Sequence, residues 1–349
     1  MLRAVVLSLV VVTGCRGVDL SASRQPPGAP VRGVPPAGGD AGTLDASMEP
    51  SISIAGPADG SVFVRDAIVE GEWAAQVTFT GNASGVSRVE LYADETFLLG
   101  EAQAGSWSID ALFRADGVRA ISARGLSATG EELVRDEIAI TIEAPGDTSC
   151  HAMLDALGLD WAPAGATRGI ADPVRVQPTI DGVSFRYTSS ASATAMLMDC
   201  ELGVRLHQLA QILHRYDIVE VEHIGIYNYR CIGGGDPDVD GCTPSMHAYA
   251  QAIDLHAFLA ANGTHYDTVE DWAITTRADP CPIASSSDQD RVLKEIACAM
   301  YEERVFEIIL TPNYNADHRN HFHVDLTDGS HYLGQSVGGV DPLLPGLDF

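Results

Sequence analysis

The chain is poor in basic residues: it has 21 Lys and Arg against 48 Asp and Glu, and a formal net charge of −27. Nucleic-acid binding requires clustered cations that neutralise phosphates, so this balance argues against nucleic acid as a partner. It also disfavours electrostatic attraction to anionic lipid. Because 46% of the residues are hydrophobic, wholesale disorder is excluded, and 349 residues suffice for two domains with separate cores.

The N-terminal apolar run, Ala4–Val12, is too short to span a bilayer as a helix. It follows Arg3 and ends in Val12-Thr13-Gly14-Cys15, which resembles the bacterial lipobox, a signal cleaved just before a cysteine that then receives lipid. An ordinary signal peptide with a chance cysteine is the alternative. We expect residues 1–14 to be a lipoprotein signal peptide, and Cys15 to anchor an exported protein in the membrane. Arg16 does not resemble the aspartate of an inner-membrane retention signal, which favours the outer membrane.

The chain has no cysteine between Cys15 and Cys150 and no Cys-x-x-Cys pair, which argues against zinc–thiolate sites. Six cysteines remain in the C-terminal half, and in an oxidising compartment this even number predicts three disulfides. The sequence alone leaves their pairing open, although proximity favours neighbours along the chain. Those pairs are Cys150–Cys200, Cys231–Cys242 and Cys281–Cys298.

Residues 16–50 are rich in Pro, Gly, Ala and Ser and have almost no large apolar side chains. Such a segment cannot bury enough surface to fold. We therefore expect residues 15–50 to comprise the lipidated cysteine and a disordered linker that holds the following domains away from the membrane.

Residues 51–145 show the period-two alternation of half-buried strands, for example at Val89, Leu91 and Ala93. Turn signals such as Gly81-Asn82 separate the apolar runs. Short strands at this spacing predict an all-β sandwich.

Three features of the same segment resemble bacterial immunoglobulin-like domains: Pro57-x-Asp59-Gly60, Val89-Glu90-Leu91-Tyr92 and Trp107. The segment contains no histidine, no cysteine and no group of acids with metal-ligand spacing. We therefore expect it to be a spacer or a weak binding module rather than a site of chemistry.

Residues 150–349 mix helical and strand patterns, which predicts an α+β domain. Apolar residues at helical spacing predict helices over about 198–216 and 289–304. Strand patterns cover 219–229, 252–258, 306–310 and 321–326.

All eleven histidines lie after residue 150, so any histidine chemistry belongs to this C-terminal domain. His321 and His323 share one face of a predicted strand, and Asp254 lies in a short apolar strand where a carboxylate needs a partner or a metal. His247 is close enough in sequence for a turn to bring it beside Asp254. Two imidazoles and one carboxylate with a vacant position for water are typical of a hydrolytic zinc site, whereas structural zinc usually has four protein ligands. Polar residues at the end of a sheet are the alternative.

The pattern Ser245-x-His247-x-x-Ala250-x-Ala252-x-Asp254, followed by His321-x-His323, resembles the extensin-like C-terminal domain. That family is in turn similar to the LAS metallopeptidases, which include peptidoglycan D,D-carboxypeptidases and endopeptidases. The resemblance covers about residues 150–330. It implies a zinc-peptidase-like fold with an antiparallel sheet, and it implies His247, Asp254 and His323 as ligands of Zn²⁺.

The resemblance also implies roles for three neighbouring residues. His318 matches a general base, His321 matches the first histidine of the His-x-His pair, and Arg230 matches an arginine that holds a substrate oxygen. A loop histidine and a surface arginine are the alternatives for His318 and Arg230. The family usually has glycine at the position of Ala250; if that position has a positive φ, alanine adds strain of about 1 kcal/mol.

The leading hypothesis is a lipid-anchored envelope zinc hydrolase that cleaves peptide bonds of peptidoglycan stem peptides or cross-links. A catalytically silent lipoprotein that binds the cell wall or acts in adhesion, with the zinc fold retained, is the second hypothesis, and Ala250 is the feature that favours it. A scaffold stabilised by disulfides alone is the third, but it leaves the joint ligand pattern unexplained. The expected partners are thus peptidoglycan or another wall peptide, and a membrane reached through the lipid anchor.

Overall fold

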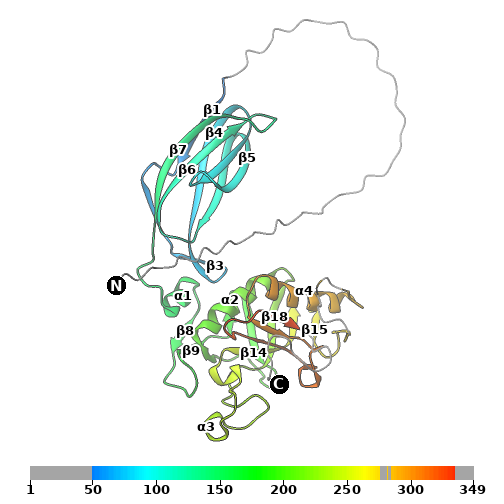
Figure 1. Cartoon of the computed structure of the whole chain (residues 1–349). Coiled ribbons are helices and arrows are strands. Elements are labelled where there is room, and N and C mark those ends of the chain that lie inside the picture. Colours follow the sequence, from blue (N-terminus) through cyan, green and yellow to red (C-terminus); the bar gives the residue numbers. More distant parts are fainter. Residues whose placement is uncertain (1–48, 276–280, 282–283, 335–349) are drawn as a thin grey trace, which may run out of the picture. The chain divides into compact units, whose positions relative to one another are not determined.

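The computed structural model of the chain describes residues 49–275, 281 and 284–334. The expected signal peptide, Cys15 and nearly all of the expected linker lie outside these residues. The described chain is multidomain and mostly β, with an N-terminal β-domain followed by a larger β-rich C-terminal domain (Figure 1). No helix in the described ranges has the length and apolar character needed to cross a membrane.

The N-terminal domain is built from strands joined in the order β1-β4-β6-β7-β2, with β3 and β5 also paired to β4. All pairs are antiparallel except β2 with β7. Alternate side chains are buried, which confirms the predicted period of two. The strands are β1 (Ser51–Gly56), β2 (Ser61–Val64), β3 (Ala67–Val69), β4 (Glu72–Ala93), β5 (Phe97–Phe113), β6 (Gly117–Leu126) and β7 (Glu132–Glu143).

The turn predicted at Gly81-Asn82 is wrong, because both residues lie inside the long strand β4. A Cβ atom on Gly81 would lie 2.0 Å from the carbonyl oxygen of Ser53 and 2.2 Å from the ring of Trp107. The glycine is therefore needed for close approach of strand and ring, and not for a turn. Strand β4 pairs with β1 before the irregularity between Ala83 and Arg88 and with β6 after it, so it joins both parts of the domain.

The C-terminal domain has one large sheet, in the order β10-β11-β13-β14-β17-β16-β18 with β15 also on β14, and one small sheet, β12-β9-β8. Its strands are β8 (Trp161–Pro163), β9 (Pro173–Val176), β10 (Thr179–Ile180), β11 (Val183–Tyr187), β12 (Met196–Asp199), β13 (Ile218–Gly225), β14 (Ala252–Ala260), β15 (His265–Asp267), β16 (Ile308–Leu310), β17 (Phe322–Asp325) and β18 (Tyr332–Gly334). Its helices are α1 (Cys150–Ala156), α2 (Cys200–His214), α3 (Pro237–Asp240) and α4 (Asp288–Glu302), with 3₁₀ turns η1 (Met246–Tyr249) and η2 (Ala316–His318).

The expectation of an antiparallel sheet is only partly correct, because the large sheet is mixed. Strand β11 runs parallel to β13, and β16 runs parallel to β18. Between β11 and β13 the chain passes through β12 and α2, and a crossover of this length lets the second strand run in the same direction as the first. Strand periodicity carries no information on direction, so the sequence pattern could not reveal these two pairs.

The large sheet separates the core of the C-terminal domain from its polar groups. Along β14 and β17, the buried residues Ile253, Leu255, Phe322 and Val324 join the cluster that includes the apolar faces of α2 and α4. The residues between them, such as Asp254 and His323, therefore project from the opposite face. This face carries the candidate site.

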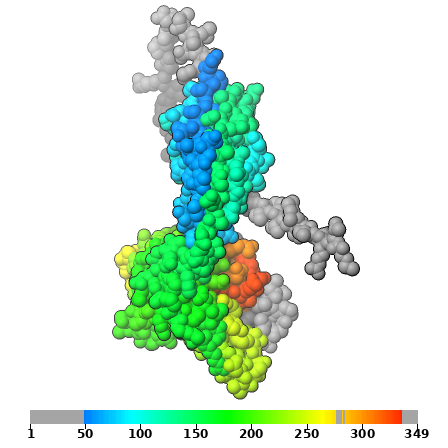
Figure 2. All heavy atoms as spheres, turned by 90° about the vertical axis from the view of Figure 1, so that its left-hand side faces the viewer, coloured from blue at the N-terminus to red at the C-terminus, as the bar shows by residue number. Residues whose placement is uncertain are grey.

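Three disulfides link the pairs favoured by proximity: Cys150–Cys200, Cys231–Cys242 and Cys281–Cys298. All of them lie in the C-terminal domain. The second one closes the loop around α3, which projects from the surface of this domain (Figure 2). Its first cysteine directly follows Arg230, so the bridge anchors the chain beside that side chain.

Candidate metal centre

Two of the three predicted ligands are placed by strand pairing. Asp254 of β14 lies directly opposite His323 of β17 in an antiparallel register. Both side chains project from the face of the sheet that lacks the helices, and the His323 Nδ1 atom lies 3.0 Å from Asp254 Oδ1. Residues opposite one another on neighbouring strands are the closest pairs that a sheet provides.

The third predicted ligand, His247, is brought to the same point by the 3₁₀ turn η1. Ser245 caps this turn, because its hydroxyl accepts a hydrogen bond from the backbone N–H of His247. The turn ends at Ala250, whose φ of 54° lies in the left-handed region. The chain can therefore reverse there and enter β14, at the cost of about 1 kcal/mol of strain for a non-glycine residue.

The donor atoms of the three residues form a compact triangle, which we call the triad (His247, Asp254, His323). His247 Nε2 lies 3.1 Å from Asp254 Oδ1 and 3.2 Å from His323 Nδ1. Four atoms bound tetrahedrally at about 2.0–2.1 Å from one ion are separated by about 3.3 Å. The side chains of His247, Asp254 and His323 are only 5%, 17% and 12% exposed. Their donor atoms already lie near the spacing that a single cation requires.

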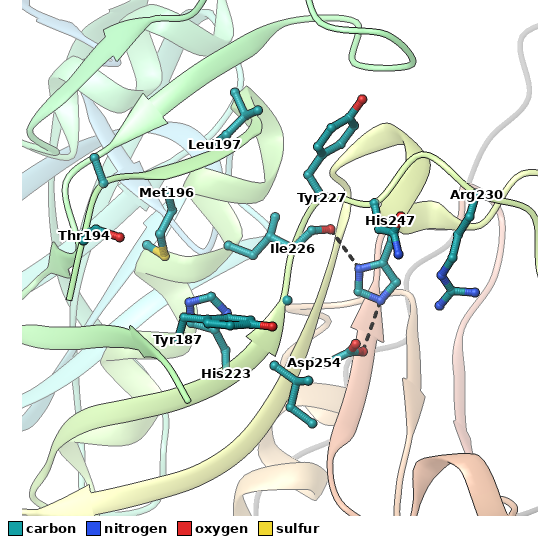
Figure 3. A pocket seen from close by; sticks show the side chains of 14 residues that line it. Tyr187, Thr194, Met196, Leu197, His223, Ile226, Tyr227, Arg230, His247 and Asp254 are labelled. Carbon is teal, nitrogen blue, oxygen red and sulfur yellow. Dashed lines mark hydrogen bonds and ion pairs between the residues drawn. The ribbon is translucent and has the colours of Figure 1, made fainter. Parts of the chain in front are cut away.

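Hydrogen bonds on the outer side of each imidazole decide which nitrogen faces the triad. His247 Nδ1 lies 2.8 Å from the carbonyl oxygen of Ile226, and His323 Nε2 lies 3.0 Å from the carboxylate of Asp325. Both partners accept, so in each neutral ring the outer nitrogen carries the hydrogen. The inner nitrogens then present lone pairs to one another and to the Asp254 carboxylate. Figure 3 shows His247 between the carbonyl oxygen of Ile226 and Asp254. Three lone pairs at one point repel one another unless a cation lies between them.

Without a bound cation, the pKa values of His323 and Asp254 also show that this point of the structure favours positive charge. Burial opposes charging of His323, but hydrogen bonds to Asp254 and Asp325 outweigh it and raise its pKa to about 10. Burial likewise opposes ionisation of Asp254, yet its hydrogen bonds to His247 and His323 hold the pKa of that carboxyl well below its usual range. A bound metal ion would take the place of this proton.

His318 lies in the same cavity as the triad and has a defined tautomer. Asn315 Oδ1 accepts hydrogen bonds from the backbone N–H groups of Asp317 and His318, and it lies 2.7 Å from His318 Nδ1. Nδ1 therefore carries the hydrogen, which leaves Nε2 unprotonated. Burial, followed by the charges of His323 and His321, lowers the pKa of His318 to about 3. The imidazole is thus neutral near pH 7.

His321 lies against the carboxylate of the triad rather than on strand β17 itself. Its Nε2 atom is 3.4 Å from Asp254 Oδ1, and its Nδ1 atom is 2.9 Å from Asn320 Oδ1. Burial is the main cause that lowers the pKa of His321. The side chain can orient the Asp254 carboxylate or share in proton transfer.

Arg230 is positioned between two cavities that meet at the triad. A cavity of about 430 Å³ is lined by Arg230, the triad, His318 and His321. A second cavity of about 570 Å³ shares Arg230, His247 and Asp254 with the first. Figure 3 shows the guanidinium beside His247. Its hydrogen bond within the described chain is to the carbonyl oxygen of Cys231, at 3.3 Å, and no described carboxylate pairs with it.

The structure therefore brings all six predicted site residues to one cavity, and it adds two that the sequence interpretation missed. Asp325, which is 4% exposed, fixes the tautomer of His323, and Asn315 fixes that of His318. Asp325 follows His323 by two residues, so the alternation that placed His321 and His323 on one face could have identified it. Asn315 offers only the weaker signal of a capping residue before a short turn.

Comparison with known proteins agrees with the division of the chain into an N-terminal β-domain and a C-terminal domain. Residues 148–333 match the family described as extensin-like protein C-terminus, and residues 50–123 match the bacterial Ig domain. Since the first match spans more than half of the sequence, the chain belongs to the extensin-like protein C-terminus family. The N-terminal domain is Ig-like, and together with the disulfides it indicates an exported protein.

Matches to individual proteins are distant. No curated protein matches the chain. Among solved structures, the fibronectin(III)-like modules of Clostridium thermocellum CbhA are 18% identical, with 27% of this chain and 98% of that chain covered and a TM-score of 0.21. The CARDB domain of a Pyrococcus furiosus protein is 12% identical, with 27% and 94% covered and a TM-score of 0.19.

Proposed function

We propose that this protein is a zinc hydrolase of the cell envelope that cleaves peptide (amide) bonds in peptidoglycan stem peptides or cross-links. The observation that carries the proposal is the convergence of three lone pairs, from His247 Nε2, His323 Nδ1 and Asp254 Oδ1, at 3.0–3.2 Å from one another. Imidazole nitrogen with one carboxylate oxygen is a donor set that suits zinc. Three protein ligands leave a tetrahedral ion one open position, as in catalytic zinc sites.

The residues around the triad supply the remaining functions of an amide hydrolase. When bound, zinc supplies Lewis acidity that activates water and polarises the carbonyl group under attack. His318 Nε2 is unprotonated, so it can take a proton from the attacking water and deliver it to the leaving amine. Arg230 has no described acidic partner, so its guanidinium is free to hold a carbonyl or carboxylate oxygen of the substrate.

The choice of substrate is supported by the similarity of the ligand pattern to LAS peptidases and by export from the cytoplasm. Lipid attachment at Cys15 would hold the hydrolase in the envelope, most simply at the outer membrane. A linker the length of residues 16–50 reaches about 30 Å as a random coil, which suits a substrate in the wall layer. Labelling with a palmitate analogue tests this part: the wild type should incorporate it, and Cys15→Ser should not.

The central test combines metal analysis with mass spectrometry of muropeptides. The wild type should contain about one zinc per chain and release or shorten peptides from purified sacculi, whereas His323→Ala should do neither. His265→Ala is the matched control, because His265 is exposed on β15 and lines neither cavity. Hydrolysis by zinc-free His323→Ala would overturn the assignment.

A different outcome would support a catalytically silent wall-binding or adhesion lipoprotein. In that case the wild type would bind about one zinc and sediment with sacculi but leave every muropeptide mass unchanged. Ala250 motivates this alternative, since the family usually has glycine there.

A further inference from the structure

The cavity of about 570 Å³ beside the triad has a wall that the proposed catalysis does not use. It is lined by Tyr187 at the end of β11, by Met196 and Leu197 of β12, and by His223 of β13. Because it shares Arg230, His247 and Asp254 with the cavity that contains His318, a ligand lying across the triad would enter both. This second cavity would thus hold the part of a substrate on the side of the triad away from His318.

His223 is a buried polar side chain in this wall without a hydrogen-bond partner. It is 6% exposed, and its Nδ1 atom is enclosed with no partner in the described chain. No hydrogen bond of its Nε2 atom to a described residue is found either, and this is the nitrogen left for a ligand. Tyr187 lies directly opposite His223 on β11 (Figure 3). The two rings meet edge to face, and their centroids are 5.7 Å apart. Burying an imidazole without hydrogen bonds is costly, and a ligand in the cavity would offset part of this cost through Nε2, since Nδ1 is enclosed.

Of the charged groups near His223, Asp254 acts on its ring and favours its protonated form, but burial outweighs this effect. Glu220 and Glu222 alternate with it along β13, and both pair with Arg186 of β11 on the other face of the sheet. The acidic and the basic groups of the cavity, Asp254 and Arg230, both belong to the wall shared with the triad. Burial lowers the pKa of His223 to about 4, so its ring is neutral near pH 7.

We propose that His223 is a specificity-determining residue of a substrate subsite that takes an uncharged hydrogen-bonding group, an amide or a hydroxyl, on an apolar stem. The inference rests on the proposed peptide hydrolase, whose substrate must extend from the triad into this cavity. Met196 and Leu197 contact the stem, and the neutral imidazole donates to or accepts from the polar end. The charged groups of this cavity, Asp254 and Arg230, belong to the wall shared with the triad, so the His223 ring itself offers a neutral hydrogen-bonding partner.

Binding of three probes of similar size tests this inference without turnover. The full-length protein is titrated with the N-acetyl, N-methylamide derivatives of glutamine, glutamate and methionine, and binding is followed by calorimetry and by the ¹⁵N resonances of the His223 imidazole. The glutamine probe should bind about tenfold more tightly than the other two, since one hydrogen bond is gained or lost, and it alone should shift the His223 resonances.

Two variants separate the role of His223 from general effects. His223→Leu should bind the glutamine and methionine probes equally. Tyr227→Phe is the matched control and should keep the preference, because the Tyr227 hydroxyl already donates to the carbonyl of Arg168. Equal binding of the three probes to the wild type, or a glutamine preference that survives in His223→Leu, would overturn the inference.

If His223→Leu does not fold, the wild-type resonances decide: the absence of a His223 shift with the glutamine probe would overturn the inference. Failure of the proposed hydrolase looks different, because muropeptides would then stay intact while the preference for the glutamine probe remained.

Discussion

The two domains handle polar side chains in opposite ways. Within residues 51–143 of the N-terminal domain, Ser122 is the one buried polar or charged residue, and charges such as Arg135 with Glu132 pair at the surface. The described C-terminal domain buries many more polar groups. They are Asp199, His207, Gln208, His223, Ser245, His247, Thr268, Asp290, Lys294, Thr311, Asn313 and Asp325.

This difference has a physical consequence for stability. An apolar core is insensitive to oxidation state, metal and moderate pH change, whereas buried polar groups depend on their partners. The C-terminal domain should therefore respond to each of these conditions, and the N-terminal domain should respond to none. Calorimetry of the full-length protein can follow both, provided that each domain gives its own transition.

Reduction of the disulfides should give the largest contrast. All three bridges lie in the C-terminal domain, and loss of a native disulfide typically costs about 2–5 kcal/mol. With dithiothreitol, the C-terminal transition should move to much lower temperature or disappear, while the N-terminal transition stays in place. Equal shifts of both transitions would contradict the contrast.

Chelation of metal should give the next largest effect. A ligand present at about a thousand times its Kd stabilises the folded state by about 4 kcal/mol, which corresponds to a Tm shift of roughly 10 °C for a domain of this size. We expect EDTA to lower only the C-terminal transition, and zinc to restore it. Asp254→Asn lacks the only carboxylate of the triad, so neither EDTA nor zinc should shift the C-terminal transition of this variant. A zinc-dependent shift that persists in the variant would show that the ion binds elsewhere.

Removal of one partner from an ion pair should cost more in the C-terminal domain. Lys294 and Asp290 pair at 2.8 Å with side chains only 2% and 0% exposed, so Lys294→Ala leaves a buried carboxylate uncompensated and should cost about 3–5 kcal/mol. Arg135→Ala in the N-terminal domain breaks solvent-exposed pairs with Glu95, Glu132 and Glu137 and should destabilise far less than Lys294→Ala. Urea unfolding of the two variants measures both values.

Mild acid should also separate the domains. Burial lowers the pKa of His223 to about 4, while an unfolded histidine titrates near about 6.5. Between these values the unfolded chain binds a proton that the folded chain does not, so stability falls as pH falls. We expect this one group to remove about 1.5 kcal/mol of stability between pH 6.5 and 5.

The loss should be measured by urea unfolding in EDTA, so that metal release does not contribute. In His223→Leu, the free energy of unfolding of the C-terminal domain should fall less steeply with pH, by the contribution of this one imidazole. The N-terminal domain has no histidine between residues 51 and 145 and should show no loss in this range. An unchanged slope in the variant would mean that another group titrates.

The smallest effect is expected at Ala250. Ala250→Gly relieves strain of about 1 kcal/mol at the positive φ, but it removes a buried methyl group worth about 0.8 kcal/mol and frees the unfolded backbone. Stability should change by less than about 1 kcal/mol, with zinc content unchanged. Ala248→Gly, also buried but without a positive φ, is the matched control and should cost about 1.5 kcal/mol. A much larger gain in Ala250→Gly would mean that alanine strains the site.

The local elements follow from the pattern of residues, as particular cases show. Leu202, Leu206, Leu209 and Leu213 predicted a helix over 198–216, and α2 runs from Cys200 to His214 with all four buried. The strand predicted at Val89–Ala93 and the turn predicted at Gly81-Asn82 belong to one strand, β4, because Gly81 serves close packing instead of a turn. A glycine signals freedom of the backbone, and only its neighbours in space show how that freedom is used.

What the sequence by itself determined is the chemistry that is available: an acidic chain, histidines confined to one domain, strands at Asp254 and His323, and six cysteines in that same domain. Periodicity is a local property, so these features can be inferred from neighbouring residues alone. Only the tertiary structure decided strand direction, the tautomers imposed by Ile226, Asp325 and Asn315, and the isolation of His223 in a cavity wall. Each of these depends on atoms that are distant in sequence or on hydrogen bonds to the backbone, which no pattern of side chains encodes.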